Sequence, residues 1–152
     1  MVLPPEVALE VPRLRGRPWT PDEVLALSSR TLAYIGDSAF ELSVRLRLLG
    51  SVTLPGGHLT GTAVTFVNAR HQAMLFEQLL AEAPADEREM LVHWRNAKQP
   101  TGRTRGGRAE YARSTAFEAW VGYLFLTGQT DRLATLIDRA LAPGGDGGTA
   151  CR

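Results

Sequence analysis

The stretch RTLAYIGDSAFELSVRLRLL, residues 30–49, predicts a long, largely apolar helix that carries an acid, Asp37, in its apolar half. A helix that is apolar nearly all round is typical of the centre of a domain, so we expect Asp37 to be buried. A buried carboxylate without a partner costs several kcal/mol, and it therefore usually has either a partner or a chemical task. The rest of the chain has to supply one or the other.

A second stretch, STAFEAWVGYLFL at residues 114–126, repeats this pattern around Glu118. Small residues lie near both acids, among them Gly36 and Gly122, and such residues let two helices approach closely. Two carboxylates brought together repel each other unless something positive lies between them, and oxygen ligands favour a hard cation such as Mg²⁺. The residues alone leave an alternative open, in which Asp37 pairs with an arginine and Glu118 caps a backbone group.

The remaining segments predict an all-α fold of about six helices in one domain. Thr20, Pro21 and Glu23 form the signature of a capped helix start, although the sequence does not decide whether this helix continues into residues 30–49. Further helices are expected at residues 62–80, 85–97 and 111–128 and from residue 130 onward, with loops at 51–61 and 99–110. We expect an N-terminal arm over residues 1–19, the helical domain over 20–142 and a disordered tail over 143–152.

Composition narrows the class of protein. The 152 residues suffice for one domain with a real core, no apolar run reaches the length of a bilayer, and the first residues lack the apolar stretch of a secretory signal. Cys151 is the only cysteine, which excludes an internal disulfide and a cysteine metal cluster. We expect a cytoplasmic protein with no membrane segment and no small-molecule cofactor.

Positive charge is concentrated in one segment. Residues 95–113 hold six basic residues and one acid, a net charge of +5 in a chain whose total is +1. Such a segment suggests a local site for a polyanion. A polyanion site next to metal-binding carboxylates suits phosphodiester hydrolysis, because a metal ion activates water and neutralises charge on phosphate.

Four pieces of the chain, LAYIGDSAFELSVRLRLL, FVNARHQA, RNAK and YARSTAFEAWVGYLFL, together closely resemble Mini-ribonuclease III. This is the miniature branch of the ribonuclease III family, which lacks a separate double-stranded-RNA-binding domain. The resemblance covers about residues 32–140. It implies an all-helical, homodimeric endoribonuclease that cuts double-stranded RNA with Mg²⁺, or with Mn²⁺ as a substitute. It also implies products with 5′-phosphate and 3′-hydroxyl ends, and a role in maturing the ribosomal RNA precursor at the ends of 23S RNA.

The resemblance implies that Asp37 and Glu118 are both catalytic and metal-binding. Larger family members carry two further acids, and Ala33 and Thr115 stand at those positions here, which leaves the number of metal ions open. Glu41, one turn after Asp37, is expected either near the metal or at a dimer interface, or else in an ion pair with Arg45.

Other residues are assigned expected roles. The residues expected to contact RNA are Arg95, Asn96, Lys98, Arg103, Arg105, Arg108 and Arg113. Core or dimer contacts are expected from Phe40, Leu42 and Leu46, and core positions from His71, Trp94 and Trp120.

Two other classes of function remain as alternatives. The first is a catalytically inactive RNA-binding module of the same fold, which the missing acids at positions 33 and 115 favour. The second is a helical-bundle interaction protein without a nucleic-acid role, which leaves the basic segment unexplained.

Overall fold

The computed structural model describes residues 17–51, 56–98 and 107–142, and every element within these ranges is a helix. The helices are α2 (Pro21–Leu25), α3 (Ser29–Ser51), α4 (Gly56–Val67), α5 (Ala69–Glu82), α6 (Ala85–Asn96), α7 (Gly107–Leu126) and α8 (Thr130–Leu141). The all-α prediction is confirmed. Most of the expected N-terminal arm and the whole expected tail lie outside the described residues.

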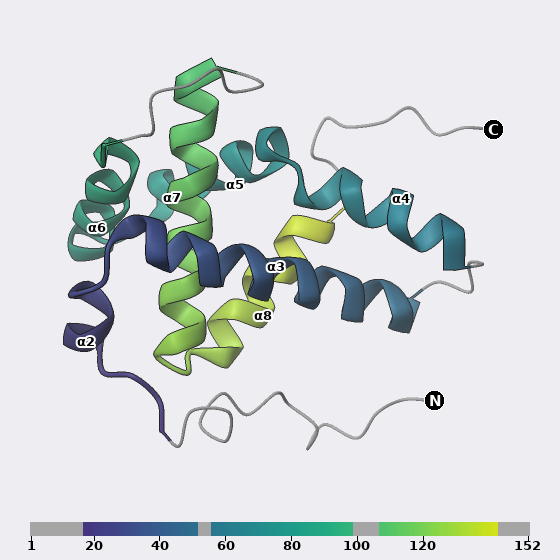
Figure 1. Cartoon of the computed structure of the whole chain (residues 1–152), viewed down its shortest axis with the longest axis horizontal. Coiled ribbons are helices and arrows are strands. Elements are labelled where there is room, and N and C mark those ends of the chain that lie inside the picture. The colour runs from purple at the N-terminus through teal and green to yellow at the C-terminus, as the bar shows by residue number, and fades with distance from the viewer. Residues whose placement is uncertain (1–16, 52–55, 99–106, 143–152) are drawn as a thin grey trace.

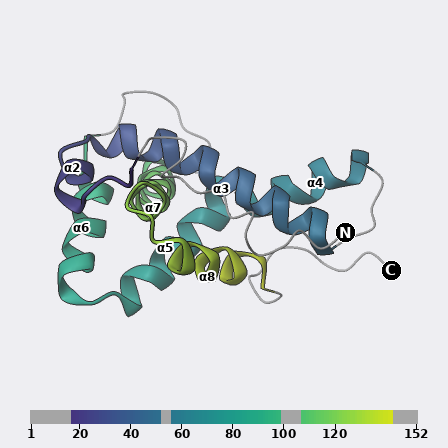
Figure 2. The ribbon, with the colours of Figure 1, turned by 90° about the horizontal axis from the view of Figure 1, so that it is seen from below.

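Helix α7 runs through the middle of the domain. In Figure 1 it crosses α3 at a steep angle, and Figure 2 shows it nearly end-on, with α3 above it and α8 below. Its buried side includes Phe117, whose ring meets that of Phe40 edge-on at 5.0 Å between centroids. Trp94 and Trp120 are each only 3% exposed, which confirms them as core residues. Helix α7 contacts other helices on several sides, and this burial explains why the sequence around Glu118 is strongly apolar.

The start of the first described helix agrees with its sequence signature. Thr20 caps α2 through its side chain, Pro21 is the first helical residue, and Glu23 accepts a hydrogen bond of 2.8 Å from the Thr20 backbone N–H. The helix ends at Leu25, and Ser28 then accepts a hydrogen bond of 3.1 Å from the Thr31 backbone N–H. The chain therefore breaks before α3, which the sequence left undecided.

The prediction of one helix over residues 62–80 is wrong. Asn68 has extended backbone angles, and its side chain accepts a hydrogen bond of 2.9 Å from the His71 N–H, so it caps a new helix, α5. Helix α4 starts at Gly56, inside the segment expected to be a loop. The loop expected at residues 99–110 is also too long, because α7 begins at Gly107, where φ is +86°.

Two leucines of α3 are not in the core. Leu42 and Leu46 are 45% and 46% exposed, whereas Phe40 is fully buried as expected. His71 is half-buried, and its Nε2 lies 2.8 Å from the Ala140 carbonyl oxygen, which is the satisfied position expected for it. No helix in the described ranges is long and apolar enough to cross a membrane.

Candidate active site

Two glycines allow α3 and α7 to touch through their backbones. A Cβ atom on Gly36 would lie 1.7 Å from the Glu118 carbonyl oxygen, and one on Gly122 would lie 2.3 Å from the Leu32 carbonyl oxygen. Real Cβ atoms do not approach other atoms so closely, so any side chain at either position would force the helices apart. Since Asp37 follows Gly36 directly and Glu118 lies one turn before Gly122, this crossing brings the two acids together.

Both acids line one open pocket of about 340 Å³. It is formed by α3, the end of α4, the start of α5 and the first half of α7. Its lining residues are Arg30, Ala33, Tyr34, Asp37, Val67, Ala69, Gln72, Tyr111, Ser114, Thr115 and Glu118. Ala33 and Thr115 therefore face the same space as the two acids, and neither of them adds a carboxylate.

Asp37 is exposed at the edge of this pocket, and the expectation that it is buried is wrong. The apolar residues that surround it in the sequence include Tyr34, which is 76% exposed, so this side of α3 is not covered by the described chain. Glu118 is the more enclosed of the two acids.

The two carboxyl groups face the same pocket and shift each other's pKa. Burial, then the charge of Asp37, raises the pKa of Glu118 to about 8, and a contact with the Gln72 side chain partly opposes this shift. Partial burial, then the charge of Glu41, raises the pKa of Asp37, while a contact with the Glu118 side chain lowers it. Near neutral pH, Glu118 accordingly holds a proton.

The donors of this pair fit a hard divalent cation. No lysine or arginine in the described part of the chain forms an ion pair with Asp37 or Glu118, although Arg30 lines the same pocket. A cation between the carboxylates would remove their repulsion and favour the ionised form of both. The described residues contain no cluster of three or more histidine, cysteine or acidic side chains, so water and substrate oxygens would have to complete the coordination, as Mg²⁺ tolerates.

Glu41 forms an ion pair with Arg45, one of the three arrangements expected for it. Its charge also raises the pKa of Asp37, so it affects the site without lining the pocket. Contact of Glu41 with a metal stays a prediction.

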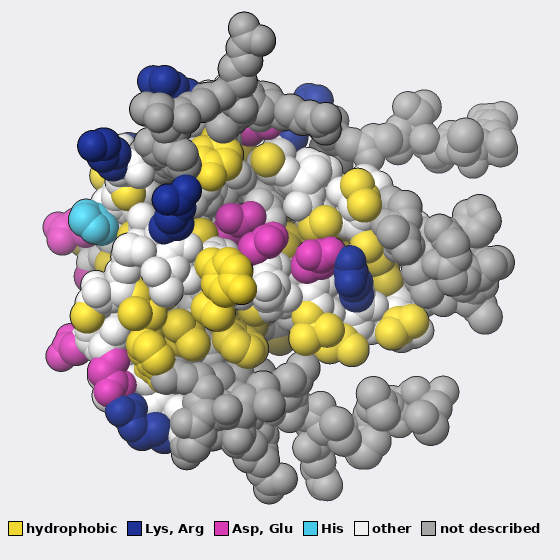
Figure 3. All heavy atoms as spheres, viewed as in Figure 1, with side chains coloured by type: hydrophobic (Ala, Val, Ile, Leu, Met, Phe, Trp, Pro, Cys, Tyr) yellow, Lys and Arg dark blue, Asp and Glu magenta, His cyan; other side chains and the backbone are white. Residues whose placement is uncertain are grey.

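The basic residues expected to contact RNA differ in their exposure and in their interactions with other side chains. Arg103 and Arg105 lie outside the described residues, whereas Lys98 and Arg108 are exposed. Arg113 forms an ion pair with Glu77. The side chain of Arg95 donates a hydrogen bond of 3.2 Å to that of Asn96. Figure 3 shows basic side chains around the upper left of the molecule, near the end of α6 and the start of α7, and acidic ones across its middle.

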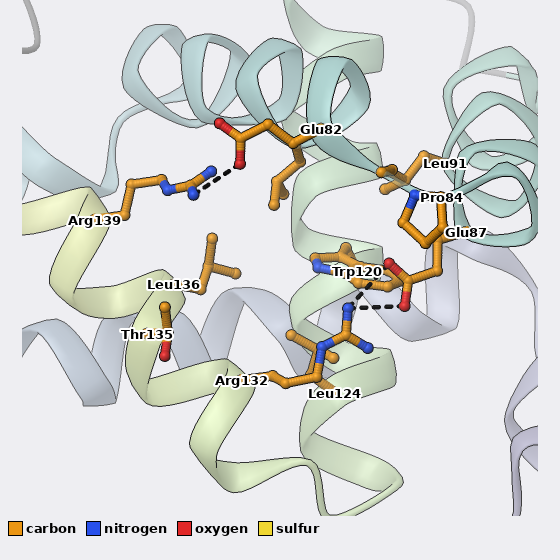
Figure 4. A pocket seen from close by; sticks show the side chains of 12 residues that line it. Glu82, Pro84, Glu87, Leu91, Trp120, Leu124, Arg132, Thr135, Leu136 and Arg139 are labelled. Carbon is orange, nitrogen blue, oxygen red and sulfur yellow. Dashed lines mark hydrogen bonds and ion pairs between the residues drawn. The ribbon is translucent and has the colours of Figure 1, made fainter.

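A second pocket, of about 270 Å³, lies between α5, α6, α7 and α8. In Figure 4 its two arginines each point at a glutamate, Arg132 at Glu87 with 2.7 Å between the charged atoms and Arg139 at Glu82 with 2.8 Å. Arg132 also lies 5.3 Å from the centre of the Trp120 ring. The charged groups in this pocket thus compensate one another, and the chemistry is expected at the Asp37–Glu118 pocket.

Sequence reasoning missed Gln72, which is 2% exposed and lines the first pocket. A glutamine within an apolar helix face is the signal that could have found it. The predicted inward side of this helix lies at His71, one residue away, because the apolar periodicity does not show the break at Asn68.

Comparison with known proteins agrees with this geometry. Residues 30–129 match the Ribonuclease III domain family, and the chain therefore belongs to the ribonuclease III family of endoribonucleases. Within it, the chain is 39% identical over 116 residues to a Mini-ribonuclease 3 of Symbiobacterium thermophilum, which covers 76% of this chain and 89% of the relative. It is also 39% identical over 120 residues to a Mini-ribonuclease 3 of Gloeobacter violaceus, with 77% and 84% covered.

A solved structure agrees with the fold. The crystal structure of a protein from Fusobacterium nucleatum superposes with a TM-score of 0.68 at 22% identity, over 76% of this chain and 93% of that one. The relatives confirm the resemblance to the miniature branch that the four sequence pieces indicated.

Proposed function

We propose that this protein is a divalent-metal-dependent endoribonuclease that cuts double-stranded RNA, acts as a homodimer and matures ribosomal RNA precursor at the ends of 23S RNA. The observation that carries the proposal is the meeting of Asp37 and Glu118 at the glycine crossing of α3 and α7, where neither forms an ion pair with a described lysine or arginine. The names and lengths of the matched relatives support the reaction class.

Asp37 and Glu118 would hold Mg²⁺, or Mn²⁺ in its place, through their carboxylate oxygens. Bound there, the ion would lower the pKa of water and neutralise charge on the phosphate. Asp37, at the exposed edge, lies where a phosphate of the RNA backbone could reach, while Glu118 is half-buried in the pocket. The water would lose a proton as its oxygen bonds to phosphorus, the bond to the 3′-oxygen would break, and the 3′-oxygen would take up a proton, leaving a 5′-phosphate and a 3′-hydroxyl.

The outer side of α3 supports the homodimer. Tyr34, Leu42, Leu46 and Leu49 are between 45% and 76% exposed, and the 3.6-residue period of a helix places them on one side of α3. Exposed apolar groups gathered in this way are typical of a protein–protein interface. Figure 3 shows apolar side chains gathered over and below α3 on this face. Because Asp37 borders this stripe, a second copy covering it would lie beside the site.

The basic side chains support RNA as the substrate. Lys98 and Arg108 are exposed, and they flank the segment 99–106, which is outside the described residues. An A-form duplex offers phosphates and 2′-hydroxyls rather than base edges, so exposed cations are suitable contacts. Arg113 is a weaker candidate than the sequence suggested, because Glu77 already pairs with it.

A defined RNA duplex incubated with Mg²⁺ tests the proposal. Wild-type protein should cut it, and Asp37→Asn should not, whereas Glu89→Gln, a change at an exposed acid of α6 that does not line the pocket, should retain most activity. An intact duplex with wild-type protein would refute the reaction. A precursor RNA carrying the 23S ends, cut no faster than an unrelated duplex, would refute the proposed substrate.

One observation favours the catalytically inactive RNA-binding module as a second candidate. Ala33 and Thr115 line the pocket where larger family members carry acids, so two carboxylates face it among the described residues. This candidate predicts salt-sensitive binding of duplex RNA with no cleavage at any Mg²⁺ or Mn²⁺ concentration. The same incubation, followed by a binding assay, separates the two.

A further inference from the structure

Gln72 lies in the first turn of α5 and presents a buried amide to the active-site pocket. The side chain is 2% exposed, and the residue lines the pocket together with Asp37 and Glu118. Its Nε2 is fully buried and has no hydrogen-bond partner of good geometry among the described residues. Buried amide groups are nearly always paired, so an orphaned one at a site calls for an explanation.

The Glu118 carboxyl group is the neighbour to which the Gln72 amide can donate a hydrogen bond. The amide is close enough to favour the ionised form of Glu118, yet the geometry falls short of a full hydrogen bond. A carboxylate that binds a cation is ionised and only accepts hydrogen bonds, and hydrogen bonds to a charged oxygen are stronger and shorter.

We propose that Gln72 is a positioning residue, whose Nε2 donates to the ionised Glu118 carboxylate and so orients it for the divalent cation. This inference rests on the metal dependence in the proposed function. The amide is satisfied when the site is loaded and unsatisfied when it is not. Gln72 therefore destabilises the metal-free protein and improves metal binding, a combination that a glutamine with a purely structural role does not produce.

Gln72→Leu and Gln72→Met test this, because both keep the size of the side chain and remove its donor. The matched control is Gln78→Leu, an exposed glutamine on the same helix. Mn²⁺ binding is measured by calorimetry on RNA-free protein, thermal unfolding is measured in EDTA, and kcat and KM are measured on a duplex at several Mg²⁺ concentrations.

We expect the Gln72 variants to bind Mn²⁺ about 10-fold or more weakly, which is typical of residues that orient a metal ligand. Their melting temperature in EDTA should be equal or higher by about 2–4 °C, because an unsatisfied buried amide is gone. Cleavage at low Mg²⁺ should fall about 10-fold and recover at high Mg²⁺, with KM for RNA unchanged. The Gln78 control should match wild type in all three measurements.

The outcomes separate this inference from the function on which it rests. Wild-type protein that cuts RNA, together with Gln72 variants whose Mn²⁺ affinity is unchanged, overturns the role of Gln72 alone. A lower melting temperature in EDTA with unchanged metal affinity identifies a structural glutamine and also overturns it. Wild-type protein that neither binds Mn²⁺ nor cuts RNA overturns the proposed function, and this inference with it.

Discussion

The two pockets of this domain differ in how their acids are compensated. Glu82 and Glu87 each face an arginine across the pocket of Figure 4, and these ion pairs link α8 to α5 and α6. Asp37 and Glu118 instead share a pocket and have no ion pair with any described cation, and the pKa of Glu118 is raised to about 8. The difference teaches that acids left without an ion pair in a pocket are stronger candidates for chemistry than acids that each face an arginine.

The largest effect is expected from removing an acid of the Asp37–Glu118 pair. Glu118→Gln should reduce cleavage of a duplex by about 10³-fold or more, because stabilisation by a bound metal is worth several kcal/mol. The matched change in the other pocket, Glu87→Gln, should leave cleavage within about twofold. Single-turnover rates at saturating Mg²⁺ measure both. Equal losses in the two variants would contradict the distinction between the pockets.

The next effect concerns the crossing that creates the pair. Gly122→Ala should lower the free energy of unfolding by about 3 kcal/mol or more, because the added Cβ would lie 2.3 Å from the Leu32 carbonyl oxygen. Urea denaturation measures the loss. Ser38→Ala, on the exposed side of α3, is the control and should change stability by about 0.5 kcal/mol or less. A Gly122→Ala protein as stable as wild type would show that the helices can separate at little cost.

A third effect follows from the raised pKa of Glu118, about 8 against a normal value of 4.5. Between these values the folded protein keeps a proton that the unfolded chain has lost, so the stability of metal-free protein should fall as pH rises from about 5 to 8. Denaturation in EDTA across this range should show a loss of a few kcal/mol. Glu118→Gln should largely remove this dependence, and Glu82→Gln should leave it. A free energy of unfolding that rises with pH over the same range would contradict this prediction.

The smallest effect is expected in the compensated pocket. Arg139→Met breaks an ion pair between partly exposed groups and should cost about 0.5 kcal/mol, with cleavage unchanged. Arg132→Met also removes the cation next to the Trp120 ring and should cost about 1 kcal/mol. Thermal unfolding measures both differences. A cleavage defect in either variant would mean that this pocket contributes to the reaction.

The meeting of the two acids was predictable from sequence because each has a glycine at close spacing. Gly36 precedes Asp37 and Gly122 follows Glu118 by one turn, which is the pattern expected of two helices that cross closely. The break at Asn68 was not predictable from periodicity, since apolar residues continue through it. Because the periodicity does not show that break, it places the inward side of α5 at His71 and not at Gln72. One residue corresponds to a rotation of about 100° about the helix axis.

The exposure of Asp37 could not be predicted from the sequence, for a different reason. Apolar neighbours such as Tyr34, Leu42 and Leu46 indicate a covered helix face, but they do not indicate whether the same chain or another covers it. The described residues leave this side of α3 open. A pattern within one chain carries no information on which molecule supplies the cover.

The crossing of α3 and α7 makes the fold and the chemistry depend on the same atoms. The surface against which Gly36 packs is the main-chain carbonyl of Glu118, the residue whose side chain belongs to the site. A change that loosens this contact moves the carboxylate, and a change that moves the carboxylate disturbs the contact. A random library screened for thermal tolerance should therefore exclude nearly the same substitutions around residues 36 and 118 as one screened for RNA cleavage. The two screens should disagree mainly at Asp37, Gln72 and the Glu118 carboxyl group itself.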